Sequence, residues 1–451
     1  MKRFRPFILL LLPFTIACSE SFLDIKPDKK LVVPSTLNDL QGLLDYFDVH
    51  NSNMPGMGEL SSDDYYILYD RWNTLSPPYL KNGYVWAKEI WEGSSSIDWN
   101  YRYQQIFYAN YVLEGLEKLN RADNQPDYDR LKGTALFHRA HALYQLTQEF
   151  CAPYNQSESG NSSGLPLRLT SDLNVHTDRA TVKETYERIV ADLLDAINYL
   201  PENDPYKTRP VKAAANTLLS RTYLIMQEYE KALLYAEAVL GAGYKLIDFN
   251  SLKASAAYPM ERFNSEVIFH SQMTQFTPLS SSRLIMDTTL YRAYANDDIR
   301  KVAWFKPVSG GYTFKGSYCG SQQTFNGIAV DECYLTKAEC LARNGSIEEA
   351  INTLNKLLVT RYKTGSYTPV SVTSQQQALT MILKERRKEL LFRGIRWSDL
   401  RRLNLDASTA TTIYRNLNGT RYKLEPNSPN YTLPVADDVI QLSKIPQNIR
   451  E

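Results

Sequence analysis

Two stretches of the chain carry the same pattern of small and large apolar positions. Residues 214–244 and 332–362 align without a gap, and the alignment pairs Ser220 with Ala338. A small residue in one helix, then a turn, then alanine in a second helix is typical of tetratricopeptide-type hairpins. Small residues let the two helices approach closely, and large ones fill the space between them. The sequence therefore predicts two helical hairpins.

Apolar residues also recur at helical spacing outside these two hairpins. The segments that show this are residues 99–120, 128–150, 181–201 and 374–404. Thr181 and Glu184 form a capping box at the start of the third segment, and Pro201 ends it. Gly394 is expected to end or kink the last helix. Helices should therefore dominate from residue 100 to 250 and from 330 to 404.

Three regions break this helical pattern: residues 45–100, 250–330 and 405–451. Within the second, "SEVIFHSQM" at 265–273 is typical of a strand, and residues 309–327 of a loop or hairpin. We expect residues 405–451 to be loop-like. The fold class is therefore mainly α: a tetratricopeptide-like helical-hairpin superhelix with long irregular loops and a few short strands. Such loops are where function is expected.

The N-terminus carries a targeting signal. Lys2, Arg3 and Arg5 precede the short apolar run in "FILLLLPFTIAC", which is too short to cross a bilayer. The run stops at Cys18, directly after a small residue, and this resembles the lipobox of bacterial lipoproteins. We expect residues 1–17 to be a signal peptide, Cys18 to be lipidated and residues 18–34 to be a tether. The alternative is an ordinary secretory signal with a chance cysteine.

Charge and cysteine content narrow the classes of function. Lysine plus arginine number 51 and aspartate plus glutamate 50, which argues against nucleic-acid binding. Cys333 and Cys340 lie too far apart on one predicted helix to bridge, so we expect no disulfide framework. The 31 tyrosines and six tryptophans favour binding surfaces, although a large helical protein also packs aromatic rings in its core.

Several motifs together resemble the SusD/RagB family of outer-membrane nutrient-binding lipoproteins. They are the lipobox followed by "FLDIKP", "FHRAHALYQLTQEFCAPY" followed by "GLPLRL", the two hairpins, "KERRKELLFRGIRWSDLRRLN" and "YTLPVADDVIQLSKIPQN". The most specific is the segment at 385–402. The resemblance covers essentially the whole chain after the signal peptide. It implies a single SusD-like domain at 35–451, with an N-terminal part to about 230 and a C-terminal part from about 231.

The resemblance also implies a role. A SusD-like protein is lipid-anchored in the outer membrane and faces the cell exterior, where a SusC-like TonB-dependent transporter is its partner. It captures an oligosaccharide or similar nutrient and delivers it for import. It has no catalytic role and needs no cofactor. The family's ligand loops match here only in character, so no substrate is implied.

The charged segment at 385–402 has a structural interpretation of its own. Glu385, Glu389 and Arg393 are spaced four residues apart and so share one helix face. Arg386 and Arg393 can pair with neighbouring helices, and Trp397 can pack back on the helix after Gly394. A solvated charged face is the alternative, but we favour a buried ion-pair network that fixes the fold.

A saccharide site needs aromatic platforms beside carboxylates, amides or arginine, because sugars present C–H faces and hydroxyl edges. Two segments supply these groups, and the candidate ligand-binding residues are Asp63, Asp64, Tyr65, Tyr66, Arg71, Trp72, Tyr79, Trp304, Tyr312 and Tyr318. Replacing Trp72 or Trp304 with alanine is expected to weaken binding without unfolding the protein. Trp86, Trp91 and Trp99 lie closer to the first long helix and are expected in the core.

Other groups of residues in the sequence offer alternatives to a saccharide site. His138 and His141 share a helix face, but with no third ligand evident we expect no metal site. After glycan capture, the second hypothesis is a tetratricopeptide-type scaffold on the outer membrane that binds only other proteins. The third is a surface glycosidase, which stays open because adjacent acidic pairs recur, as at 63–64.

Overall fold

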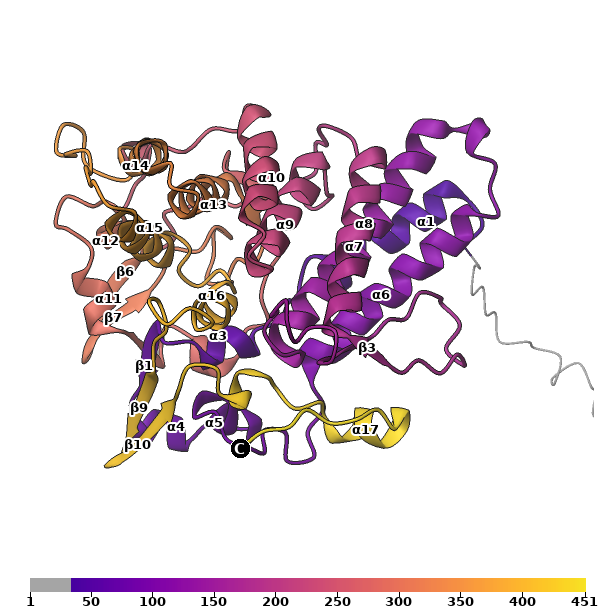
Figure 1. Cartoon of the computed structure of the whole chain (residues 1–451), viewed down its shortest axis with the longest axis horizontal. Coiled ribbons are helices and arrows are strands. Elements are labelled where there is room, and N and C mark those ends of the chain that lie inside the picture. The colour runs from indigo at the N-terminus through magenta and orange to yellow at the C-terminus, as the bar shows by residue number, and fades with distance from the viewer. Residues whose placement is uncertain (1–33) are drawn as a thin grey trace, which may run out of the picture. The chain divides into compact units, whose positions relative to one another are not determined.

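The computed structural model describes residues 34–451, and Thr36–Glu451 form one compact unit. The predicted signal peptide, Cys18 and nearly all of the tether lie outside the described residues. Helices dominate the unit (Figure 1). The longer ones are α1 (Leu37–Leu44), α6 (Ile97–Leu116), α7 (Gln125–Phe150), α8 (Val182–Tyr199), α9 (Lys212–Ile225), α10 (Tyr229–Gly241), α13 (Val330–Arg343), α14 (Ile347–Leu358), α15 (Gln375–Glu389) and α16 (Arg396–Leu403).

Short elements lie between and beyond these helices. The short helices are α2 (Phe47–His50), α3 (Met57–Ser61), α4 (Tyr69–Asn73), α5 (Tyr79–Tyr84), α11 (Thr288–Arg292), α12 (Arg300–Ala303) and α17 (Asp437–Ser443). The strands are β1 (Tyr65–Ile67), β2 (Ser163–Pro166), β3 (Arg179–Thr181), β4 (Val267–Phe269), β5 (Leu284–Met286), β6 (Phe305–Val308), β7 (Gly311–Phe314), β8 (Ile328–Ala329), β9 (Ile413–Leu417) and β10 (Thr420–Leu424). They pair antiparallel in two-stranded sheets: β1–β5, β2–β3, β4–β8, β6–β7 and β9–β10.

The two predicted hairpins are confirmed as α9–α10 and α13–α14. Consecutive helices from α6 to α10 pack against one another, and α10 continues the array onto α13 (Figure 1). The small residues do what the pattern requires: Ala338 and Ala350 are fully buried, and the Ser220 hydroxyl donates to the Ala232 carbonyl at 2.7 Å. The mainly α, tetratricopeptide-like class is therefore correct.

Gln227 occupies the turn of the first hairpin, where the second hairpin has Gly345, and both adopt left-handed backbone, with φ of 61° and 86°. Gln227→Gly should raise the free energy of unfolding by about 0.5 kcal/mol, since glycine adopts this conformation without strain. Gly345→Ala is the matched control, because an added Cβ would meet nothing within 4 Å. It should lower the unfolding free energy by about 1 kcal/mol in urea titrations. Equal stability of all three proteins would contradict this.

The other predicted helices are confirmed as α6, α7, α8 and α15–α16. The capping box is present, with the Glu184 amide donating to Thr181 Oγ1 at 3.1 Å and the Thr181 amide donating to Glu184 Oε2 at 2.8 Å. Helix α15 ends at Glu389, and Gly394 lies in the break with φ of 71°. Trp397 belongs to a buried cluster with Trp86 and Tyr431, and its ring lies 4.8 Å from that of Tyr431.

The C-terminal region was wrongly predicted to be loop-like, because it contains the β9–β10 hairpin and α17. Figure 1 shows the yellow β9–β10 hairpin beside the purple helices α4 and α5. Hydrogen bonds join the two regions: Trp91 Nε1 donates to the Pro434 carbonyl at 2.7 Å, and Arg450 donates to the Ala87 carbonyl at 2.7 Å. Trp86, Trp91 and Trp99 are buried in the core, as predicted.

The charged segment at 385–402 forms a buried ion-pair network, as predicted. Arg386 Nε bonds Asp399 on α16 at 2.8 Å, and Arg393 Nη2 bonds Asp331 on α13 at 2.6 Å. All four side chains are at most 8% exposed, so the solvated-face alternative is wrong. The network joins α15 to the second hairpin.

Candidate functional site

The two segments predicted to bind ligand come together in space. Strand β1 pairs with β5, which places Tyr66 opposite Ile285. The turn of the β6–β7 hairpin packs on the same position, and the Tyr66 hydroxyl donates to the Gly310 carbonyl at 3.4 Å. A Cβ on Gly311 would lie 2.9 Å from Ile285, so this contact requires glycine. Residues far apart in the sequence thus share one surface.

Four of the predicted residues lie at least partly open on this surface: Tyr66, Arg71, Trp72 and Tyr312. The Tyr312 ring stacks on Tyr291 of α11, with 3.7 Å between ring centroids and 15° between planes. Trp72 Nε1 donates to the Lys81 carbonyl at 3.3 Å, and Arg71 donates to the Arg283 carbonyl at 3.0 Å. Packing on one side of these residues leaves the other side accessible.

Five predicted ligand residues are instead buried, which corrects their assignment: Asp64, Tyr65, Tyr79, Trp304 and Tyr318. Two of their hydroxyl groups form hydrogen bonds within the core. The Tyr65 hydroxyl donates to the Leu60 carbonyl at 2.7 Å, and the Tyr318 hydroxyl donates to Glu266 at 2.5 Å. Aromatic rings among polar neighbours gave the same sequence signal whether they packed inward or outward, so the sequence could not separate the two cases.

Asp63 is the remaining predicted residue, and it is committed to ion pairs. Its carboxylate bonds Arg396 at 2.7 Å and Arg387 at 3.1 Å. Burial alone would raise the pKa of Asp63, but the charges of Arg396 and Arg387 outweigh it and hold the pKa below its ordinary value. We infer that Asp63 fixes α15 and α16 to the β1 region.

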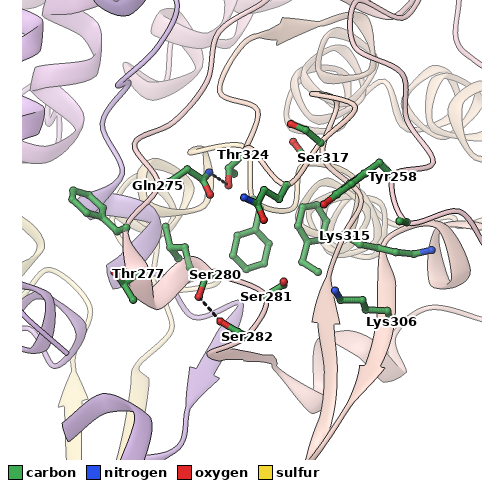
Figure 2. Close-up of a pocket in the computed structure, with 17 residues that line it drawn as sticks. Tyr258, Gln275, Thr277, Ser280, Ser281, Ser282, Lys306, Lys315, Ser317 and Thr324 are labelled. Carbon is green, nitrogen blue, oxygen red and sulfur yellow. Dashed lines mark hydrogen bonds between the residues drawn. The ribbon is translucent and has the colours of Figure 1, made fainter. Parts of the chain in front are cut away.

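A cavity of about 490 Å³ opens beside the β6–β7 hairpin. None of its lining residues is among those predicted from the sequence. Most of its walls carry hydroxyl, amide or aromatic groups, and Figure 2 labels several of these side chains together with Lys306 and Lys315. The lining residues are Ala257, Tyr258, Gln275, Phe276, Thr277, Leu279, Ser280, Ser281, Ser282, Lys306, Phe314, Lys315, Ser317, Ser321, Gln322, Thr324 and Phe392.

Hydrogen bonds connect the segments that form the walls of the cavity. Gln275 Nε2 donates to the Thr324 hydroxyl at 2.8 Å, so the segment before β5 is tied to the segment after β7 (Figure 2). Lys315 Nζ donates to the carbonyls of Ala254 and Ala256 at 2.9 and 2.6 Å, which fixes the wall that carries Tyr258.

Aromatic rings form the apolar part of the cavity. Phe314 stacks on Phe392, with ring centroids 4.8 Å apart and planes 22° apart, and stays partly open. Tyr258, which is 45% exposed, also lines the cavity. Tyr312 lies two residues before Phe314 on β7, so the open surface described above and the cavity share one strand.

The sequence signal for the cavity was weak because its lining comes from separate segments. The sequence predicted ligand binding in the region 250–330, among others, but none of the predicted residues lines the cavity. Within that region, "QFTPLSSS" at 275–282 is polar and lacks a periodic pattern, which marks a loop but says nothing of its neighbours. Phe392 belongs to the break after α15, and no local pattern connects it to β7.

His138 and His141 are both buried. Burial lowers the pKa of both rings well below the ordinary value, so they stay neutral. The cysteines at 151, 319, 333 and 340 are free and buried. Within residues 34–451, no helix is long and apolar enough to span a membrane.

Two family models match this chain. One, described as starch-binding and associating with the outer membrane, matches residues 21–224, and the other, the SusD family, matches residues 253–448. A SusD-like protein of Formosa agariphila is 23% identical over 376 residues, which span 69% of this chain and 72% of that protein. The chain belongs to the SusD family.

Solved structures share the fold. A SusD superfamily protein from Bacteroides thetaiotaomicron has a TM-score of 0.75 at 23% identity, over 92% of this chain and 100% of that one. A laminarin-binding SusD-like protein has a TM-score of 0.63 at 20% identity, over 91% of this chain and 97% of that one. The helical array and its loops are therefore an architecture found in this family.

Proposed function

We propose that the protein is a glycan-capturing lipoprotein of the outer membrane that delivers an oligosaccharide to a SusC-like TonB-dependent transporter. It is held through Cys18, faces the cell exterior and catalyses no reaction. The observation that carries the proposal is a cavity of hydroxyl, amide and aromatic side chains on a SusD-family fold. A relative with the same fold is named for binding laminarin.

The cavity has the chemistry that a sugar requires. The Tyr258 and Phe314 rings offer apolar faces to the C–H side of a pyranose. Gln275, Gln322 and Ser281 offer donors and acceptors to its hydroxyls. Such a mixed wall suits a saccharide better than a purely apolar ligand.

Beyond the cavity, we propose that a longer glycan continues over the neighbouring open surface. Tyr66, Trp72 and Tyr312 would stack on further sugar units, and Arg71 would donate to their hydroxyls. These four are sequence-predicted residues whose side chains stay at least partly accessible.

Tyr258→Ala should weaken binding of the recognised oligosaccharide about tenfold, because it removes one stacking face worth about 1–3 kcal/mol on the scale known for base–aromatic stacking. The measurement is isothermal titration calorimetry, after a panel of polysaccharides in affinity gels has identified the ligand. Tyr206→Ala is the control, since Tyr206 is 57% exposed and is not part of the cavity lining. Equal loss in both variants, or in neither, would contradict the assignment.

Delivery to a transporter has its own test. Mild solubilisation of membranes that hold a C-terminally tagged protein should recover a large β-barrel in stoichiometric amount. Recovery with soluble partners alone would instead favour the protein-binding scaffold.

A further inference from the structure

The proposed glycan cavity carries an unbalanced positive charge. Its only charged lining residues are Lys306 and Lys315, and no carboxylate lines it. Among residues 34–451, neither ammonium group has an ion pair, whereas many other cations of the chain do. A cavity built for neutral sugars has no need of this excess.

The two lysines play different parts. Lys315 donates to two backbone carbonyls, which pair two of its three N–H groups without cancelling its charge. Burial, and then the like charge of Lys306, lower the pKa of Lys315 below its ordinary value, and no carboxylate opposes the shift. Lys315 therefore acts as a fixed part of the wall.

Lys306 is free to meet a ligand. It is exposed on β6, next to Thr313 of β7 in the hairpin register, and no hydrogen bond to its ammonium group occurs within the described residues. Figure 2 shows its ammonium end turned toward the cavity and Ser281, whereas that of Lys315 turns away. No contact within residues 34–451 explains why the Lys306 side chain takes this position.

We propose that the cavity selects an anionic oligosaccharide. Lys306 binds a carboxylate or sulfate group of the sugar, and the positive charge of Lys315 strengthens the attraction. This inference rests on the proposed glycan-binding function and names its substrate class. An ammonium group is a point charge that serves both anions, so the shared chemistry is a negatively charged sugar. The attraction is local, because the whole chain is nearly neutral, with 51 basic and 50 acidic residues.

The test compares neutral and anionic glycans on the intact protein. Affinity gels with laminarin, starch and xyloglucan form the neutral arm, polygalacturonate and alginate the carboxylate arm, and carrageenan the sulfate arm. The wild-type protein should bind within one anionic arm, and which arm binds identifies the group. Affinity measured by calorimetry on oligomers of that glycan should fall as salt is raised, since the contact is electrostatic.

Lys306→Gln should weaken binding of the anionic oligomer about tenfold and flatten its salt dependence, because a charge-assisted hydrogen bond is lost. Lys356→Gln on α14 is the matched control, as an exposed lysine outside the cavity lining, and should change neither quantity. Binding confined to a neutral glycan, or unchanged by Lys306→Gln, would overturn this inference and leave the proposed function standing. Failure to bind any glycan of the panel would overturn both.

Discussion

Trp304→Ala should destabilise the protein by about 3–5 kcal/mol, the cost typical of truncating a buried tryptophan. The side chain is 2% exposed, and its ring packs edge-on against Phe249 at 6.1 Å and Tyr294 at 6.3 Å. Gly316 lies directly against it, since a Cβ there would come within 2.0 Å of the indole. The neighbours of the indole belong to different segments that are each held in place by their own contacts. We therefore expect them to fill little of the cavity that the substitution leaves.

The measurement is thermal and urea denaturation of the variant beside Trp72→Ala. Trp72 is only partly buried on α4, so its truncation should leave stability close to that of the wild type while weakening glycan binding. This reverses part of the sequence-based expectation, which gave both tryptophans the same role. A Trp304→Ala protein that unfolds like the wild type but fails to bind glycan would show that the ring faces the ligand.

Arg300→Met should cost about 3–5 kcal/mol of stability, because removing one partner of a buried ion pair leaves uncompensated charges. Arg300 is fully buried and bonds Asp298 at 2.8 Å, Glu385 at 2.7 Å and Glu389 at 2.8 Å. Burial alone would raise the pKa of Asp298, but the charge of Arg300 outweighs it and holds the pKa below its ordinary value. Methionine fills part of the volume, so most of the loss should be electrostatic.

Arg121→Met is the control for this variant. Arg121 also bonds a carboxylate, that of Asp129 at 2.7 Å, but its side chain is 53% exposed. Solvent screens such a pair, and the midpoint of unfolding should stay close to that of the wild type. A similar small effect for Arg300→Met would show that the buried network fixes the geometry of α15 without stabilising it.

Local patterns predicted the helices and missed the partners of their side chains. Thr181 and Glu184 specify the start of α8 by themselves, and the spacing of Glu385 and Glu389 indicates one helix face. The arginine that joins these two glutamates lies on α12, which no local pattern connects to α15.

The same limit applies to the candidate site. Trp304 and Tyr312 flank one hairpin and look alike in sequence, yet one packs into the core and the other stays open. What decides between them is contact with Phe249 and Gly316 for the first and stacking on Tyr291 for the second. These are tertiary contacts, so sequence reasoning located the ligand-binding regions without sorting their residues.

The most direct test of the account is a crystal structure of the protein with the oligosaccharide that binds it most tightly. We predict a sugar ring in the cavity between Tyr258 and Phe314, with an anionic substituent within hydrogen-bonding distance of Lys306 Nζ. A glycan bound elsewhere on the protein, with the cavity holding only water, would contradict the central claim.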